Sequence, residues 1–346
     1  MFQSYTIKDI AKALNLSTST VSRALNGSHE IGAETKKLVL EYAEKINYRP
    51  NPIALSLKEQ KSHSIGVVVC EVANNYFSQA INGIESIAYN SGYHVIITQT
   101  HESAERELAN VQHLLSRQVD GLLVSLSAQT VNTSIYEELH SKGFPIVFFD
   151  RIAHNIQTHR IVLDNFVAAF EATESLINSG FTRIAHLTST SNLLISQERF
   201  KGFMAALQKH GLNFPPAYFR QCNHGGMLMT EVETVVKELM ELPVPPDAIL
   251  STNDRLTTHC ISILKGSGYK IPEDVALIGF TNSDVAESFD PPLTVVRQPA
   301  FQMGQMATEL LIKTIESKQR VENYTTEVLA AELICRESSQ CISPIN

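Results

Sequence analysis

Residues 6–27 read TIKDIAKALNLSTSTVSRALNG, and this stretch predicts two short helices joined by a tight turn. Thr6 can cap the first helix, with Asp9 at the reciprocal capping position, and Ser17 can cap the second. Apolar residues recur at helical spacing along one side of each helix, at Ile7, Ile10, Ala11 and Leu14 and then at Val21, Ala24 and Leu25. The pattern is typical of a helix-turn-helix domain.

A third helix is predicted from about residue 33 to residue 47, with Leu38, Tyr42 and Ile46 facing inward. Pro50 and Pro52 end it, because a residue before proline is pushed out of the α region. Residues 53–60 favour helix, but about two turns are too short to be stable alone. We therefore expect a headpiece at residues 1–49 and, at residues 50–62, a hinge that orders on binding.

Charge is distributed unevenly along the chain. Residues 1–62 contain nine Lys and Arg against six Asp and Glu, a net charge of +3, whereas the whole chain carries −8. The exposed face of the second helix presents short hydroxyls and one arginine, at Thr18, Ser19, Thr20, Ser22 and Arg23, with Asn26 at its end. Short side chains let a helix approach phosphates and base edges, so this face favours nucleic-acid binding over an inert hydroxyl-rich surface.

From residue 64 onward, apolar β-rich runs alternate with helical patterns. Strands are predicted at residues 65–69, 94–98, 121–126, 145–149, 160–163, 183–187, 248–251 and 275–280. Helices are predicted at residues 77–90, 105–117, 166–178, 198–210 and 255–265. The alternation indicates parallel sheets covered by helices on both faces, and the number of strands indicates two similar α/β lobes. We expect a ligand at the carboxyl ends of the strands, in the cleft between the lobes.

The composition excludes several classes of protein. Hydrophobic residues make up 43% and charged residues 18%, and no stretch approaches the roughly 18 apolar residues that a membrane helix needs. The N-terminus has no apolar block of the kind that marks a secretory signal peptide. The five cysteines are scattered and form no CxxC pair, so we expect reduced thiols in a cytoplasmic protein. No cofactor, metal site or catalytic residue is predicted.

The chain resembles the LacI/GalR (lactose-repressor) family of transcriptional regulators. The resemblance rests on residues 6–27 and on YRPNPIALSL at 48–57, which is similar to the family's hinge. It continues in order through SIGVVV at 64–69, VDGLLV at 119–124, FDR at 149–151, ERFKGF at 198–203, ND at 253–254, IPEDV at 271–275 and PPLTVVRQP at 291–299.

The resemblance implies an all-α helix-turn-helix headpiece followed by an α/β two-lobed, periplasmic-binding-protein-like core with two doubly wound parallel sheets. This effector-binding and dimerisation core would span residues 63–346. One lobe is expected at about residues 63–162 and 294–324, and the other at about residues 163–293 and 325–346.

The resemblance also assigns roles in the headpiece and hinge. Thr18, Ser19 and Arg23 match positions that read bases in the major groove, and Leu57 matches a hinge leucine wedged into the minor groove. The positions that fix the helix on phosphates are Ser17, Thr20, Ser22 and Asn26, together with Thr6. Two hinges act side by side, so a homodimer on a near-palindromic double-stranded DNA operator is implied. Thr18 and Ser19 are short, which leaves Arg23 as the most committed base reader.

Several polar residues of the body lie where a ligand is expected. Asp150 follows the strand 145–149 at its carboxyl end, and Asn253 and Asp254 follow the strand 248–251. Arg199 is predicted near the start of a helix, where positive charge is unfavourable, and a ligand oxygen could compensate it. Asp254 is explained equally well as a helix cap and as a ligand contact.

By the resemblance, Asp150, Arg199 and Asn253 match positions that hydrogen-bond a small polyhydroxylated effector. The same pocket has wall positions that match Tyr76, Phe77, Ser125, Asp164 and His224. Two positions depart from the family pattern: Thr281 stands where an aspartate is common, and His224 where an aromatic ring often stacks on the ligand. Both departures make the predicted charge of the site neutral or positive. A site of that charge makes a sugar acid or phosphorylated sugar more plausible. A neutral sugar or oligosaccharide remains the favoured effector.

These features predict a sequence-specific DNA-binding transcriptional regulator, a repressor of a carbohydrate-use operon controlled allosterically by an effector bound between the lobes. Three alternatives stay open. A solute-binding protein of a transport system would share the lobes, but it would need an export signal and would have no use for the headpiece. An enzyme is disfavoured because no GxGxxG, P-loop or GxSxG motif and no histidine pair at metal-ligand spacing occurs. The body could also be a dimerisation scaffold with an empty cleft.

Overall fold

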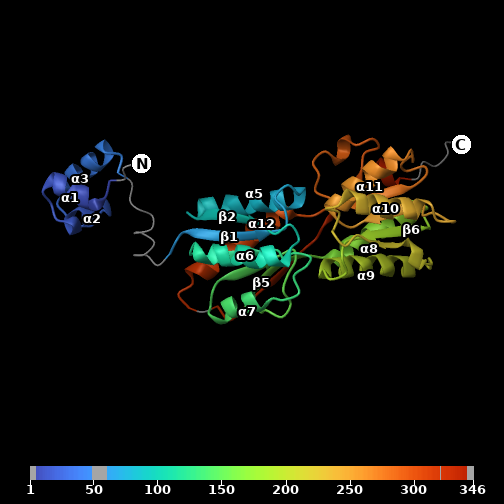
Figure 1. The fold of residues 1–346 in the computed structure, drawn as a ribbon, viewed down its shortest axis with the longest axis horizontal. Helices are drawn as coiled ribbons and strands as arrows, with labels where there is room; N and C mark the ends of the chain where they lie inside the picture. Colours follow the sequence, from blue (N-terminus) through green and yellow to red (C-terminus); the bar gives the residue numbers. More distant parts are fainter. Residues whose placement is uncertain (1–4, 49–60, 320, 341–346) are drawn as a thin grey trace. The chain divides into compact units, whose positions relative to one another are not determined.

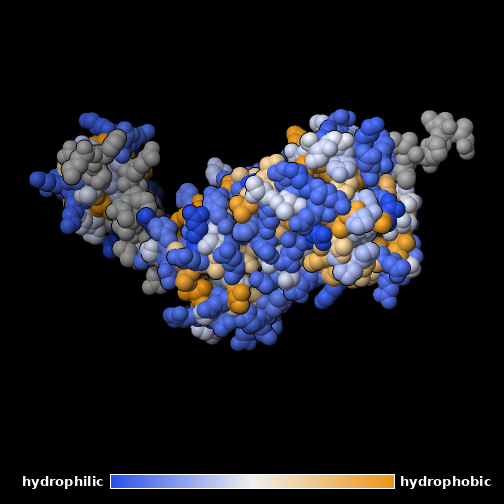
Figure 2. All heavy atoms as spheres, turned by 45° about the vertical axis from the view of Figure 1, so that its right-hand side comes forward, coloured by the Kyte–Doolittle hydropathy of each residue, from blue (hydrophilic) through white to orange (hydrophobic). Residues whose placement is uncertain are grey.

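The computed structural model describes residues 5–48, 61–319 and 321–340, and the chain divides into two compact units, Met1–His63 and Ser64–Asn346. The predicted hinge residue Leu57 lies outside the described residues. Elements are labelled as in Figure 1. No helix among the described residues is long and apolar enough to span a membrane. Hydrophilic side chains predominate on the face drawn in Figure 2, and hydrophobic ones lie there in small groups.

The first unit contains the three predicted helices, α1 (Ile7–Leu14), α2 (Thr18–Leu25) and α3 (Ala33–Lys45). Their small core buries two residues from each helix: Ile10 and Ala11, Val21 and Ala24, Val39 and Ala43. The prediction for α3 is wrong at Leu38, which is 48% exposed while its neighbour Val39 is buried. Tyr42 and Ile46 pack against the core, so the apolar face is rotated by one residue from the predicted one.

The ends of α1 and α2 are set by local side-chain chemistry, as predicted. The Thr6 backbone N–H and hydroxyl each donate to Asp9 Oδ2 at 2.7 Å, and Ser17 Oγ accepts from the Thr20 backbone N–H at 3.0 Å. Asn15 ends α1 in the left-handed conformation, with φ 54°, which asparagine adopts more readily than most residues. The turn between the two helices is therefore encoded by side chains between Thr6 and Thr20.

The second unit contains two six-stranded sheets, each in its own lobe. The first sheet is wholly parallel, in the order β11-β5-β4-β3-β1-β2. Its strands are β1 (Ser64–Val69), β2 (His94–Gln99), β3 (Gly121–Val124), β4 (Ile146–Phe149), β5 (His159–Leu163) and β11 (Thr326–Leu329). Helices α5 (Asn75–Asn90) and α12 (Ala300–Glu316) pack on one face, and α6 (Ala104–Ser116) and α7 (Ser134–Ser141) pack on the other (Figure 1).

The second sheet has the order β12-β10-β9-β8-β6-β7 and is parallel except for the antiparallel pair β10 and β12. Its strands are β6 (Ile184–Thr188), β7 (Phe219–Gln221), β8 (Ala248–Ser251), β9 (Ala276–Phe280), β10 (Thr294–Arg297) and β12 (Glu332–Ile334). Helices α8 (Asn165–Asn178) and α9 (Leu194–Lys209) cover one face. Helices α10 (Met229–Met240) and α11 (Asp254–Gly266) cover the other.

The eight predicted strands and five predicted helices of the body are all present, with ends shifted by a few residues. Four strands were not predicted, namely β7, β10, β11 and β12. No residue of β7, β11 or β12 is fully buried, so these three lack the apolar run that marks a buried strand, whereas β10 is buried but contributes only Val295 and Val296 as apolar residues.

The expected lobe boundaries are wrong at two strands. Residues 294–324 were expected in the first lobe, but β10 lies in the second sheet, and α12 alone of this stretch packs in the first lobe. Residues 325–346 were expected in the second lobe, but β11 pairs in parallel with β5 of the first sheet. The chain therefore passes between the lobes three times: after β5, after β10 and after β11. Strand pairing over such sequence distances leaves no local signal.

His186 of β6 is a titratable residue inside the second lobe. Its ring is fully buried, with ring centroids 4.8 Å from Phe203, 5.3 Å from Phe200 and 6.1 Å from Phe219. Neither ring nitrogen has a hydrogen-bond partner among the described residues. Burial, with a smaller contribution from the Arg199 charge, lowers the pKa of His186 to about 3 from its usual 6.5.

We predict that His186→Phe weakens the acid sensitivity of the fold. Because the pKa is depressed in the folded state, the unfolded chain binds more protons than the folded chain between pH 6.5 and 3. As the pH is lowered through this range, the free energy of unfolding therefore falls by up to about 1.4 kcal/mol per pH unit. Denaturant unfolding from pH 7 to pH 4.5 should show a shallower decline in the variant. The exposed histidine of α6 provides the control, His113→Gln, and equal slopes for all three proteins would contradict the prediction.

Candidate DNA-binding and effector-binding sites

The exposed face of α2 carries the predicted DNA contacts. Val21 and Ala24 are fully buried and fix the orientation of the helix in the headpiece. The opposite side leaves Thr18, Ser19, Arg23 and Asn26 exposed, with Thr20 and Ser22 partly exposed. Ser17 and Thr6, also exposed, stand at the N-caps of α2 and α1. The predicted residues of the headpiece thus share one helix and the caps beside it.

Hydroxyl groups at the N-terminus of α2 form a local cluster. Ser17 Oγ lies 2.8 Å from both Ser19 Oγ and Thr20 Oγ1, within hydrogen-bond distance. A helix N-terminus with free N–H groups and short hydroxyls is a favourable place for a phosphate oxygen. This geometry suits the phosphate-fixing role that the resemblance implies for Ser17 and Thr20.

Arg23, the predicted base reader, is not free in this structure. Its Nη1 lies 3.1 Å from Glu30 Oε2, and the side chains are 58% and 68% exposed. An ion pair this exposed contributes little stability, so a base edge or phosphate can replace Glu30 at small cost. The pair holds the guanidinium at the surface of the headpiece.

In the core, Asp150 follows β4 directly and is 7% exposed. It has a φ of 60°, a backbone conformation that a non-glycine residue adopts only when its surroundings enforce it. Burial raises the pKa of the Asp150 carboxyl, although the nearby Arg151 and Arg199 charges oppose this. A buried carboxylate at the carboxyl end of a parallel strand is the group that was predicted to accept hydroxyl hydrogen bonds.

Three predicted wall residues of the first lobe are buried. Tyr76 and Phe77, in the first turn of α5, pack edge to face with ring centroids 5.2 Å apart, and the Tyr76 hydroxyl contacts Met303 Sδ at 3.3 Å. Ser125 follows β3, and its buried hydroxyl lies beside the Asp150 carboxyl, whose pKa burial raises and this hydroxyl lowers by hydrogen bonding. Its oxygen can still accept a hydrogen bond from a ligand.

Arg199 is buried but does not lie at the start of a helix. Helix α9 begins at Leu194, so Arg199 is in its second turn, and the expected unfavourable position at the N-terminus is wrong. Its guanidinium instead donates to Asn165 Oδ1 at 2.9 Å, to Gln298 Oε1 at 2.9 Å and to the Thr252 carbonyl. Burial lowers the pKa of Arg199 to about 10, and its Cζ lies 4.2 Å from the centre of the Phe280 ring.

The predicted residues after β8 divide into a cap and a buried pair. Asn253 is the N-cap of α11, since its Oδ1 accepts from the Leu256 backbone N–H at 2.8 Å. Asp254 is 8% exposed and accepts a hydrogen bond from the Thr281 hydroxyl. The cap role that was open for Asp254 therefore belongs to Asn253. The family pattern has an aspartate at position 281. Here that position is a threonine, and the carboxylate of Asp254 lies beside it.

Asp164 and His224 are placed less favourably than Asp150 for binding a ligand, because each already has a partner in the protein. Asp164 caps α8 by accepting from the Val167 backbone N–H at 3.0 Å. The His224 side chain is 57% exposed, and its Nδ1 lies 3.3 Å from Glu231 Oε2. The negative charge of Glu231 offsets any positive charge on His224. The structure therefore does not support a positive charge of the site at this position.

A cavity of about 310 Å³ connects the two lobes at Asp150. The first lobe contributes Ser127, Asp150 and Arg151, and the second contributes Asn165, Asn192 and Glu198. Asp150 is the one predicted effector residue in its lining. Three residues that the sequence analysis missed are chain neighbours of predicted ones: Arg151 follows Asp150, Asn165 follows Asp164, and Glu198 precedes Arg199. Their position next to a predicted residue is the signal in the sequence that could have identified them.

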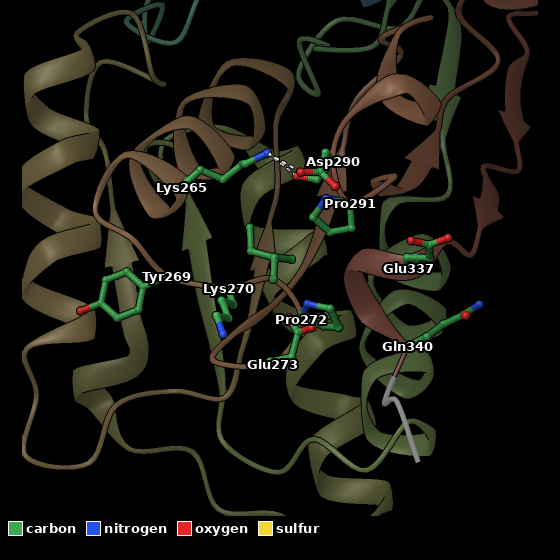
Figure 3. A pocket seen from close by; sticks show the side chains of 10 residues that line it. Lys265, Tyr269, Lys270, Pro272, Glu273, Asp290, Pro291, Glu337 and Gln340 are labelled. Carbon is green, nitrogen blue, oxygen red and sulfur yellow. Dashed lines mark hydrogen bonds and ion pairs between the residues drawn. The ribbon is translucent and has the colours of Figure 1, made fainter. Parts of the chain in front are cut away.

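A larger cavity, of about 570 Å³, lies in the second lobe and contains no predicted residue (Figure 3). Its lining carries both signs of charge, including Lys265, Lys270, Glu273 and Glu337, and Lys265 Nζ lies 3.5 Å from Asp290 Oδ2. Volume alone therefore does not mark it as the effector site. No group of three or more His, Cys, Asp or Glu among the described residues could hold a metal ion.

Polar contacts tie the lobes together beside α5. Arg255 of α11 forms a two-point ion pair with Glu71, which follows β1; its Nε donates to Glu71 Oε2 at 2.7 Å, and its Nη2 donates to Oε1. Gln79 of α5 exchanges hydrogen bonds with Asn282, which follows β9, at 3.1 and 2.7 Å. These contacts stabilise the lobe arrangement seen here.

We predict that Glu71→Gln loosens the contact between the lobes. The variant removes the charge that holds Arg255, while the Gln79 to Asn282 bonds remain. Small-angle scattering without ligand should give a larger radius of gyration for the variant. The control is Glu138→Gln, which breaks an exposed ion pair between α7 and its C-cap residue Lys142. A profile that matches both the control and the unmodified protein would show that the ion pair does not hold the lobes.

Comparisons with known proteins agree with this architecture. A family model described as "Bacterial regulatory proteins, lacI family" matches residues 6–51, and one described as "Periplasmic binding proteins and sugar binding domain of LacI family" matches residues 62–335. The HTH-type transcriptional repressor CytR of Escherichia coli (strain K12) is 30% identical over 337 residues, which are 97% of each chain. The HTH-type transcriptional repressor PurR of Vibrio vulnificus (strain CMCP6) is 31% identical over 341 residues, 98% of this chain and 99% of the relative.

A solved structure of the lac repressor dimer, bound to operator and the anti-inducer ONPF, shows the same fold. It superposes with a TM-score of 0.83 at 22% identity and covers 98% of this chain and 100% of that one. The fold and the two candidate sites define a regulator with a helix-turn-helix headpiece and a two-lobed ligand-binding core. The chain belongs to the LacI family of bacterial transcriptional regulators.

Proposed function

We propose that the protein is a repressor of a carbohydrate-use operon. It binds a near-palindromic operator as a homodimer in the cytoplasm, and a small neutral sugar or oligosaccharide bound between the lobes controls that binding. It acts as a regulator and not as an enzyme. The observation that carries the proposal is a buried carboxylate, Asp150, in the cavity between two lobes that follow a helix-turn-helix headpiece.

Carbohydrate is supported by the chemistry of the residues around Asp150. Its carboxylate and the Ser125 hydroxyl offer buried acceptors for the hydroxyl groups of a polyol. The bonds of Arg199 to protein use three of its five N–H donors, so further donors remain for a ligand oxygen. The family model that matches residues 62–335 is described as a sugar-binding domain, which agrees with this chemistry.

A neutral effector is favoured over a sugar acid or phosphorylated sugar. Arg151 is paired with Glu102 and Arg255 with Glu71, so neither presents an uncompensated positive charge. Arg199 donates to neutral acceptors and lies near the Asp150 charge. An anionic ligand would meet the Asp150 carboxylate, and Arg160, the lining arginine without a carboxylate partner among the described residues, already donates to the backbone carbonyls of residues 153, 154 and 156.

The proposed switch acts through the lobes. Effector in the cavity favours one relative orientation of the lobes, and in a dimer this orientation sets the distance between the paired hinges at residues 50–61. That distance decides whether the hinges order on DNA, with Leu57 as the minor-groove wedge. A coupling of about 1–3 kcal/mol would change operator affinity about 5- to 150-fold.

Operator binding measured by fluorescence anisotropy tests the proposal. The DNA is the promoter nearest the protein's own gene, and the panel contains neutral sugars and the corresponding sugar acids. We expect tight binding that weakens steeply with salt, because phosphates supply much of the energy, and a several-fold change with one neutral sugar. Tight binding that no compound in the panel changes would rule out the carbohydrate effector.

We predict that Arg23→Ala removes most discrimination between operator and unrelated DNA. A bidentate contact to guanine contributes about 1–3 kcal/mol of discrimination, so the affinity ratio should fall about 5- to 150-fold. The control is Lys45→Ala, which removes one exposed positive charge from α3. It should weaken binding to both DNAs alike. Full discrimination in the Arg23 variant would show that this arginine is not the reader.

We predict that Asp150→Asn reduces effector affinity at least tenfold and leaves operator affinity without effector unchanged. The amide keeps the shape of the side chain but offers one acceptor oxygen in place of the carboxylate's two. Titration calorimetry with the sugar found by anisotropy measures the loss. Asp290→Asn, at a side chain that is fully exposed, serves as the control and should bind effector normally.

A further inference from the structure

Arg151 lies next to Asp150 but bonds elsewhere. Its Nε is 3.8 Å from Asp150 Oδ2 and has no hydrogen-bond partner among the described residues. Its Nη1 donates to Glu102 Oε1 at 2.9 Å and to Oε2 at 2.7 Å. The same nitrogen contacts Cys70 Sγ at 3.0 Å and the Leu126 carbonyl at 3.4 Å. The guanidinium is thus directed away from the carboxylate beside it.

Glu102 is held in place from several sides. It lies in the turn between β2 and α6, where His101 and Glu102 both have positive φ, 49° and 64°. Such a conformation persists only where the surrounding structure enforces it. Its Oε2 accepts from the Ala128 backbone N–H at 2.7 Å and from the Cys70 thiol at 3.5 Å. Burial by itself raises the pKa of Glu102, but Arg151 and these hydrogen bonds outweigh it and hold the pKa below its usual value.

We propose that Glu102 is a positioning residue of the effector site: by engaging Arg151, it prevents an internal Arg151–Asp150 ion pair and leaves the Asp150 carboxylate available to the hydroxyl groups of a neutral effector. The inference rests on the proposed function, in which Asp150 binds the effector. Glu102 itself is absent from the cavity lining, whereas Asp150 and Arg151 both line it. Its action on the ligand is therefore indirect.

The physical reason is the cost of an unpaired buried charge. The Arg151 side chain is 13% exposed, and a buried cation that loses its carboxylate partner is drawn to another carboxylate within reach. If Glu102 loses its charge, the nearest remaining carboxylate is Asp150, already within 3.8 Å. The new ion pair would occupy the acceptor oxygens that a sugar needs, and the sugar would have to break it in order to bind.

Three variants separate this role from simple support of the fold. Glu102→Gln removes the charge while keeping the shape, and the double variant Glu102→Gln/Arg151→Met also removes the competing cation. Glu107→Gln is the matched control: its buried carboxylate accepts from the Ser127 backbone N–H at 2.6 Å and the Tyr136 hydroxyl at 3.0 Å, and no arginine of the described residues bonds to it. Glu107 and Glu102 anchor adjacent residues of the same loop, Ser127 and Ala128.

The first measurement needs no ligand. Full-length protein labelled with [γ-¹³C]aspartate is titrated by NMR, and Asp150→Asn identifies the Asp150 signal. The charged and titratable groups that act on Asp150 are Arg151, Arg199, Glu102, Tyr76 and Cys70, and the Ser125 hydroxyl also hydrogen-bonds to it. We expect the Asp150 midpoint to fall by at least one pH unit in Glu102→Gln and to return to the unmodified value or above in the double variant. An unchanged midpoint in Glu102→Gln would overturn the proposal.

The second measurement is effector affinity by calorimetry, with the sugar that shifts operator binding. We expect a loss of at least tenfold in Glu102→Gln, recovery to within about threefold in the double variant, and little loss in Glu107→Gln. A double variant that binds worse than the single one would assign Glu102 a merely structural role. If no sugar shifts operator binding, the proposed function fails, while the Asp150 titration still decides whether Glu102 directs Arg151.

Discussion

The Arg199 guanidinium links the points at which the chain passes between the lobes. Asn165, one acceptor, begins α8 just after the first passage, and Gln298, another, lies in the second. The Asp164 backbone N–H donates to the Leu329 carbonyl at 2.8 Å and joins the first passage to the third. Since parallel strands end at one edge of their sheet, fixing these passages also sets the edge of the first sheet, where Asp150 and Ser125 lie, against the edge of the second sheet, where Thr281 lies.

Most of the buried positive charge near the cavity has a local partner, although Arg160, which also lines it, is held among the described residues by backbone carbonyls alone. Arg151 is opposed by Glu102, Arg255 by Glu71, and Arg199 by neutral oxygens with Asp150 nearby. A buried ion is tolerated only with such partners, because desolvation otherwise costs several kcal/mol. The consequence for the proposed function is that Arg151 and Arg255 add little attraction for an anionic ligand. In the sequence, Thr281 and His224 made a sugar acid or phosphorylated sugar more plausible, while a neutral sugar remained favoured, because the sequence could not show that His224 meets Glu231.

The headpiece and the core differ in how their structure is encoded. In the headpiece, caps, turn and apolar stripes all lie within about forty residues, and the prediction of its helices was correct apart from the rotation at Leu38. In the core, the strands with long apolar runs were predicted, whereas β10, β11 and β12 were not. These short strands pair with partners far away in the sequence, and their residues carry no pattern of their own.

The sequence by itself determined the class of fold and predicted α2 and Asp150 as parts of the two binding sites, because periodicity, capping residues and strand-end polar groups are local properties of a chain. Tertiary structure alone decided which groups meet: Glu102 with Arg151, Glu71 with Arg255, Thr281 with Asp254, and His224 with Glu231. The electrostatic character of the effector site follows from these pairings. The strength of a charge in a protein depends on its distance from its partners and on its burial, and the folded chain sets both.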